Sequence, residues 1–231
     1  MIRHTKGIVL SSIKYAESSI VCRIYTEEFG IQSYLINGVR KKRGTSSYYQ
    51  VLSILDLVVF HKDSGGLQRV KEVRFARQHN SIPFNILKSS VALFLAEVLN
   101  KCLREEEKNQ DLFSFLLSSI IGFDKNPFDS SFHVRFLLKL SAHLGFYPDF
   151  SNSHLPYFDL MNGFFVNHKP AHQHFIGAPL ITLFVSLLKQ ENNILSEKKR
   201  LLNKLLEYYE LHLDGFANIR SHEILDTVLK T

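Results

Sequence analysis

The hydrophobic periodicity of the chain changes once, near Pro83, and this change constrains the fold more than any other feature. Before it, apolar and polar residues alternate, as in Ser53–Lys62, where Leu55, Leu57 and Val59 share one face. A period of two is typical of a β-strand. After it, apolar residues recur about every 3.6 positions, which is the period of an α-helix. The sequence therefore predicts an α+β chain in which the strands come first and the helices follow.

Residues 1–80 contain five segments with strand character, separated by turn-forming residues. They are Gly7–Tyr15, Ser19–Thr26, Ile31–Gly38, Ser53–Lys62 and Leu67–Arg77. The serine pair in the first segment predicts an irregularity there. Five short strands with one longer connection after the third are typical of a small closed barrel. We expect an OB-fold, the barrel most used for single-stranded nucleic acid.

Residues 81–231 are predicted to form an all-helical domain. Its expected helices are Asn85–Arg104, Gln110–Gly122, Phe132–Leu144, Ala178–Gln190, Ser196–Leu213 and Ser221–Leu229. Gly122 and Gly145 are predicted helix stops, and Ser221 is a predicted N-terminal cap. Residues 146–177, which contain three prolines and several asparagines, are expected to be loop-rich.

Charge is distributed unevenly along the 231 residues. Residues 1–80 hold 13 Lys+Arg and 6 Asp+Glu, a net charge of +7, whereas residues 81–231 hold 15 and 16, a net charge of −1. The whole positive excess of +6 is therefore in the first third. This asymmetry predicts a polyanionic partner for residues 1–80, with nucleic acid the commonest candidate.

The strongest local signal is the run Arg40-Lys41-Lys42-Arg43, which leaves the third predicted strand and ends at Gly44. Four consecutive cations repel one another, so such a run lies either in solvent or against an anion. Phosphate contacts from Lys and Arg give affinity without sequence preference. We predict that the run binds nucleic acid. The secondary contacts predicted beside it are Lys14, Arg23 and Arg74, with Tyr48 and Tyr49 as exposed rings on which bases stack.

A second predicted surface lies on the third helix. Arg135 and Lys139 are four residues apart and therefore share a face, next to Phe136 and Leu140. Cations around an apolar floor suit a short acidic peptide with an apolar end. Ordinary helix cations over a core explain the same pattern equally well.

The sequence predicts no catalytic or metal site, and therefore no cofactor. It has no Gly-rich phosphate loop, HExxH motif, nucleophile elbow or CxxC motif. The histidines His168, His172 and His174, with His154 as a fourth ligand, are the one candidate for a zinc site, but Pro170 interrupts any helix that would align them. The two cysteines, Cys22 and Cys102, are too few for a disulfide framework.

No apolar run is long enough to span a membrane, and the N-terminus has no pattern of a secretory signal, so we expect a cytoplasmic protein, associated with the nucleoid if its anionic partner is DNA.

Several motifs, taken together and in order, resemble the RecO family of bacterial recombination mediators. Four of the matching segments are short motifs: a Gly-Ile-Val-Leu strand (Gly7–Leu10), a Tyr-x-Glu-Ser turn (Tyr15–Ser18), a Thr-x-Glu-x-Gly hairpin (Thr26–Gly30) and a Gly-x-Arg-basic run (Gly38–Arg43). Two longer stretches nearer the C-terminus, Arg135–Phe150 and Tyr208–Leu225, also match. The resemblance covers almost all of the chain.

The resemblance implies an N-terminal OB-fold and a C-terminal helical domain. It also implies binding of single- and double-stranded DNA, strand annealing, and, with RecR, loading of RecA onto DNA coated with single-strand-binding protein. The acidic, Phe-ended tail of that protein is expected on the helical domain, at Arg135 and Lys139. Many members carry a four-cysteine zinc motif where this chain has residues 146–177, which contain no cysteine. We therefore expect that zinc site to be lost.

Two other interpretations fit the residues. The first is an RNA-binding accessory protein with the same barrel chemistry, because the positions that would contact a 2′-hydroxyl are not identifiable. The second is a non-catalytic scaffold for protein interactions, in which the basic run is only solvated.

Overall fold

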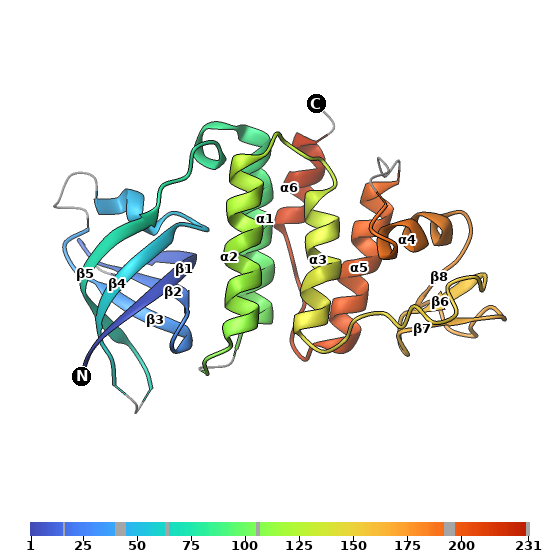
Figure 1. Ribbon diagram of the computed structural model, residues 1–231, viewed down its shortest axis with the longest axis horizontal. Coiled ribbons are helices and arrows are strands. Elements are labelled where there is room, and N and C mark those ends of the chain that lie inside the picture. Colours follow the sequence, from blue (N-terminus) through green and yellow to red (C-terminus); the bar gives the residue numbers. More distant parts are fainter. Residues whose placement is uncertain (16, 40–44, 63–64, 105–106, 192–196, 230–231) are drawn as a thin grey trace. The chain divides into compact units, whose positions relative to one another are not determined.

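The computed structural model describes residues 1–15, 17–39, 45–62, 65–104, 107–191 and 197–229. The chain forms two compact units (Figure 1). The first comprises Met1–Phe128 and Ile219–Thr231, and the second comprises Asp129–Asn218. The predicted domain boundary at residue 80 coincides with the change from strands to helices, and it stays a prediction. Unit 1 contains both the barrel and the two helices that follow it.

Unit 1 begins with a closed five-stranded barrel, so the predicted α+β class with an N-terminal barrel is confirmed. The strands are β1 (Ile2–Lys14), β2 (Ile20–Thr26), β3 (Gly30–Ile36), β4 (Ile54–Phe60) and β5 (Gln68–Arg77), in the spatial order β1-β2-β3-β5-β4. Only β3 and β5 pair in parallel. β1 starts earlier than predicted because Ile2–Ile8 pair with Phe60–Ile54 of β4.

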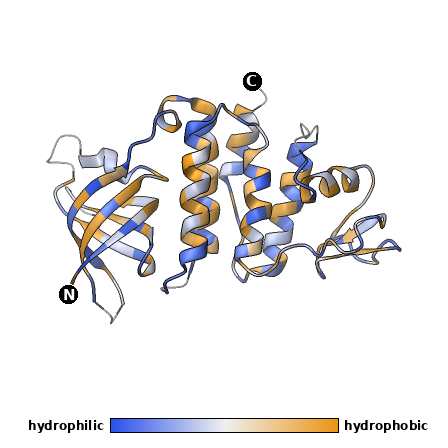
Figure 2. Ribbon diagram, viewed as in Figure 1, coloured by the Kyte–Doolittle hydropathy of each residue, from blue (hydrophilic) through white to orange (hydrophobic). Residues whose placement is uncertain are grey.

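The barrel interior follows from the period-two pattern. Val9, Leu55, Leu57 and Val59 point inward and are almost fully buried. Figure 2 shows apolar and polar residues mixed along the same strands, as this alternation requires. The pairing of β1 with β2 shifts register between Val9 and Ser11, which confirms the irregularity predicted at the serines.

Three helices complete unit 1: α1 (Ile86–Cys102), α2 (Gln110–Lys125) and α6 (Ser221–Val228), with a short helix η2 (Ile82–Phe84) before α1. Side chains of Asn85 and Asn109 cap α1 and α2. Gly122 was the wrong stop for α2, because a glycine inside a helix weakens it without ending it.

The predicted cap of α6 is also wrong. The carboxylate of Glu97, on α1, accepts hydrogen bonds from the backbone N–H of Arg220 and of Ser221. The Ser221 hydroxyl donates to the same carboxylate and accepts no hydrogen bond from the backbone N–H groups of α6, as a cap would. A residue more than 120 positions away in the sequence therefore performs the capping.

A buried polar cluster joins the last strand to the helices of unit 1. The Asp124 carboxylate accepts hydrogen bonds from the backbone N–H of Asn80, Ser81 and Ile82 at 2.8–3.1 Å. Lys88, only 3% exposed, donates to the Ser81 hydroxyl at 2.7 Å and to the Asp124 carbonyl at 3.1 Å. Burial of these charges is tolerated because hydrogen bonds satisfy them.

Unit 2 contains α3 (Phe132–His143), α4 (Leu180–Leu188) and α5 (Lys198–His212). The prediction of an all-helical domain is wrong for this unit, because it also contains strands. The strands β6 (Tyr157–Asp159), β7 (Phe164–Val166) and β8 (Phe175–Ile176) form a small sheet in the order β7-β6-β8. Strands of two or three residues are too short for the period-two pattern to reveal them, which explains the loop-rich prediction for residues 146–177. No helix among the described residues is long and apolar enough to cross a membrane.

Candidate nucleic-acid interface

The predicted basic run, Arg40–Arg43, lies outside the described residues. The sequence places it between the end of β3 at Ile36 and a short helix, η1 (Thr45–Tyr49). The predicted contacts that the structure does describe are the flanking tyrosines and the cations of β1, β2 and β5.

Tyr48 and Tyr49 both lie on η1 but occupy different environments. Tyr49 is 4% exposed and belongs to the barrel core, so the prediction of an exposed stacking ring is wrong for it. Burial, followed by the nearby Cys22 and Tyr48, raises the pKa of the Tyr49 phenol. Tyr48 is half-buried, with its ring centroid 4.5 Å from that of Phe75. Of the two tyrosines, Tyr48 is therefore the one that keeps part of its ring available for a base.

The Arg23 side chain makes hydrogen bonds within the fold. Its guanidinium donates from Nη1 to the Asn100 carbonyl at 3.1 Å and from Nη2 to the Leu103 carbonyl at 2.9 Å. These carbonyls belong to the C-terminal end of α1, where a cation is favoured. Burial, and then the like charge of Arg104, lowers the pKa of Arg23. We therefore remove Arg23 from the proposed DNA contacts.

Arg74 lies in a groove of about 780 Å³ on the outer face of β1, β4 and β5. The strand register aligns Lys6 with Asp56 and Asp56 with Arg74, so charges alternate across the sheet. Arg74 Nε is 3.2 Å from Asp56 Oδ2. Glu27 and Glu72 also line the groove. Three carboxylates beside these cations make the groove a poor surface for a phosphate backbone.

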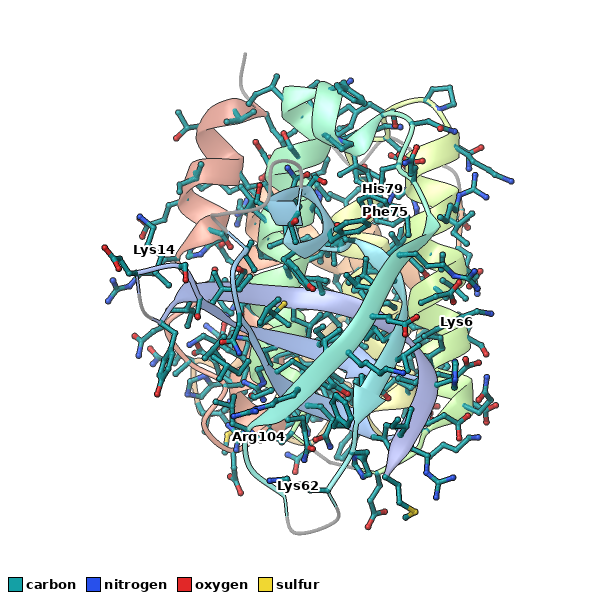
Figure 3. The ribbon with its side chains drawn as sticks, turned by 90° about the vertical axis from the view of Figure 1, so that its left-hand side faces the viewer. Lys6, Lys14, Lys62, Phe75, His79 and Arg104 are labelled. Carbon is teal, nitrogen blue, oxygen red and sulfur yellow. The ribbon has the colours of Figure 1, made fainter. Side chains whose placement is uncertain are left out.

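Lys14 ends β1 and is exposed. Figure 3 shows Lys14, Lys6 and Lys62 at separate edges of the barrel rather than gathered on one face. Lys14, Lys6 and Lys62 therefore do not form one positive patch, and the charge case for DNA binding still depends on the sequence of residues 1–80, including Arg40–Arg43.

Arg135 and Lys139 do come together, on α3. Both line a small pocket of about 140 Å³ with Leu138, Tyr147, Leu187 and Gln190. Arg135 forms an ion pair with Asp129, and burial lowers its pKa. Lys139 is exposed. Lys139 thus places a positive charge beside an apolar floor, the arrangement predicted for an acidic peptide.

The four histidines do not converge. His172 Nε2 is 3.4 Å from Asp159 Oδ2, and His174 Nδ1 is 2.7 Å from Glu207 Oε1. Among the residues that the structure describes, no group of three or more His, Cys, Asp or Glu side chains is placed to hold a metal ion. The contacts of His172 and His174 instead tie residues around the small sheet to one another and to α5.

Family models match nearly the whole chain. The model described as "Recombination protein O N terminal" matches residues 1–79, and "Recombination protein O C terminal" matches residues 83–221. The two matches meet where the periodicity changes.

Curated relatives agree with these matches over their full length. The chain is 34% identical to the DNA repair protein RecO of Flavobacterium psychrophilum over 232 residues, which cover 97% of this chain and 98% of that protein. It is 36% identical to the DNA repair protein RecO of Azobacteroides pseudotrichonymphae, covering 99% of each. The RecO of Bacteroides fragilis is 33% identical, covering 97% of this chain and 98% of the relative.

Proposed function

The chain belongs to the RecO family of DNA repair proteins, and from this we propose that it is a non-catalytic recombination mediator that binds single- and double-stranded DNA and promotes annealing. The observation that carries the proposal is a closed five-stranded barrel in the segment that holds the entire positive excess, +7 over residues 1–80. The described residues contribute Lys14 and Tyr48, and the sequence contributes Arg40, Lys41, Lys42 and Arg43.

Annealing follows from charge neutralisation. Two strands repel each other through their phosphates, and cations that bind phosphate lower this repulsion while releasing counterions. Contacts of this kind do not read bases, so the protein should anneal complementary strands of any sequence.

The family further suggests protein partners. We propose that the chain acts with RecR, and that the acidic tail of single-strand-binding protein docks in the Arg135–Lys139 pocket. Docking of the tail would bring DNA coated with single-strand-binding protein close to this chain, and RecA would then be loaded onto that DNA. A Phe side chain suits the apolar floor made by Leu138, Tyr147 and Leu187, and an acidic stretch suits Lys139 at the rim.

The proposal is tested with a 40–43 variant, in which Arg40, Lys41, Lys42 and Arg43 are all replaced by Gln. Its matched control replaces four lysines outside the barrel, Lys108, Lys125, Lys189 and Lys199, by Gln. Binding of a labelled single strand of about 30 nucleotides should weaken by ten-fold or more at about 0.1 M salt in the 40–43 variant and by less than two-fold in the control. Equal binding by both variants would overturn the assignment and favour a protein scaffold.

Competition separates DNA from RNA. Unlabelled DNA of the same sequence should displace the labelled strand at a concentration equal to or below that needed for RNA. Displacement by RNA at a ten-fold lower concentration would favour the RNA-binding interpretation, because it would indicate readout of the 2′-hydroxyl.

A further inference from the structure

Unit 2 contains a second pocket, of about 440 Å³, that none of the predicted sites includes. It is bordered by β6, β8 and their flanking loops on one side and by α5 on the other. Its lining residues are Tyr157, Lys169, Gln173, Phe175, Ile176, Gly177, Ala178, Leu180, Arg200 and Lys204. Its volume falls in the range of roughly 300–1,000 Å³ that is usual for ligand sites.

The charge of this lining is entirely positive. Lys169, Arg200 and Lys204 line the pocket and no carboxylate does. Arg200 and Lys204 are one helical turn apart on α5 and share a face. Arg200 Nη1 is 3.4 Å from Glu197 Oε2 and Lys204 Nζ is 2.7 Å from Glu207 Oε2, but neither Glu lines the pocket. This composition contrasts with that of the barrel groove, where three carboxylates are present.

The aromatic rings of the pocket are held in place. The Tyr157 and Phe175 rings meet edge to face, with centroids 5.8 Å apart and an interplanar angle of 78°. Lys169 Nζ lies 5.5 Å from the Phe175 centroid, a cation–π contact. Gly177 supports the Tyr157 ring, because a Cβ added at Gly177 would lie 3.0 Å from Tyr157 Cδ1. Tyr157 is half-buried rather than fully buried, so part of this fixed ring is open to a flat ligand.

We propose that this pocket is a second nucleic-acid site, which holds one nucleotide or a few nucleotides of a single strand through base stacking on Tyr157 and phosphate contacts from Lys169, Arg200 and Lys204. Rings interleaved with cations are the pattern of sequence-tolerant single-strand binding. An acidic peptide is the competing ligand. The pocket favours nucleic acid over the peptide because it has three cations and about three times the volume of the Arg135–Lys139 pocket. The choice of nucleic acid over peptide also rests on the proposed function, whereas the existence of a ligand site rests on the pocket alone.

The first test places two exposed cations of the pocket, Lys169→Gln with Arg200→Gln, in the background of the 40–43 variant. The matched control in that background is Lys125→Gln with Lys189→Gln, which removes the same charge elsewhere. Single-strand affinity should fall a further five-fold or more in the pocket variant, and the slope of log K against log salt should become shallower by about 1.4, or about 0.7 per phosphate contact. The control should change neither quantity.

The second test locates the strand. Full-length protein is irradiated with a single strand containing 5-iodouracil, and the cross-linked peptide is identified by mass spectrometry. We expect cross-links on peptides containing Tyr157 or Phe175. The cross-link at position 157 should be retained in Tyr157→Phe and lost in Tyr157→Leu, because only the first keeps the ring.

Three outcomes would overturn the proposal, and they can be told apart. If the wild type binds the strand, but the pocket variant matches its control and no cross-link falls on Tyr157 or Phe175, the second site fails while the barrel site stands. If the pocket variant loses an acidic Phe-ended peptide and keeps the single strand, the pocket binds peptide. If the wild type binds no single strand at low salt, the proposed function fails as well.

Discussion

Two hydrogen bonds fix Arg23 between β2 and the last turn of α1, at 3.1 and 2.9 Å. The replacement Arg23→Gln should lower the free energy of unfolding by about 1–3 kcal/mol, since hydrogen bonds from a charged donor contribute about that much. Single-strand affinity should stay within two-fold of wild type. Urea denaturation and strand titration on the same preparation check both quantities. Lost affinity at unchanged stability would restore Arg23 as a DNA contact.

Asp124 should make stability depend on pH. Burial acts to raise the pKa of its carboxyl, but the backbone N–H groups of Asn80, Ser81 and Ile82, with His79, outweigh burial and hold that pKa below its ordinary value. A carboxyl whose folded pKa is lowered stabilises the fold above its unfolded pKa, about 3.9, and this stabilisation is lost as the pH falls through the folded pKa.

Asp124→Asn therefore should destabilise the fold by about 2–3 kcal/mol at pH 7 and by less below pH 4. Urea unfolding at pH 7 and pH 3.5 measures the difference, with the exposed Asp214→Asn as the control. A wild-type-to-variant difference that does not shrink in acid would show that the Asp124 charge contributes nothing.

Helix α6 shows how an element can depend on a distant one. The Glu97 carboxylate of α1 accepts hydrogen bonds from backbone N–H groups at the start of α6. Glu97→Gln should therefore lower the stability of that end of α6 by about 1–2 kcal/mol. Hydrogen exchange should therefore accelerate for the α6 amides while those of α2 keep their wild-type rates. Replacement of Glu223, an exposed carboxylate within α6, is the control. Unchanged exchange in Glu97→Gln would mean that α6 is held by packing alone.

The elements themselves differ in how well the sequence predicts them. The five barrel strands and the helices follow from periodicity, because each buries one face over several repeats. The strands β6–β8 could not be predicted in this way, since two or three residues contain too few repeats. Tyr49 was misplaced for a related reason: its polar neighbours suggest a loop, whereas η1 turns its ring into the barrel core. The Glu97 cap and the Asp124 cluster depend on contacts between distant residues, which no local pattern records.

At the scale of the whole molecule, the uneven charge is a better guide to function than the cations seen one at a time. Of the predicted DNA-binding residues that the structure describes, Tyr49 is buried, Arg23 contacts α1 and Arg74 is paired with Asp56. The net charge of +7 over residues 1–80 remains, and four of its cations are Arg40–Arg43. The pocket bordered by α5 was not predicted because Lys169 lies more than 30 residues before Arg200 and Lys204, and residues 81–231 as a whole have a net charge of −1.

The most direct test of the account is the salt dependence of single-strand binding by the wild type, the 40–43 variant and its four-lysine control. If the barrel binds phosphates through residues 40–43, the logarithm of the association constant should fall steeply with the logarithm of the salt concentration in the wild type and the control. The 40–43 variant should then have a slope shallower by up to about 2.8, or about 0.7 for each lost contact. The same slope and affinity in all three proteins would contradict the account, because the basic run would then touch no phosphate.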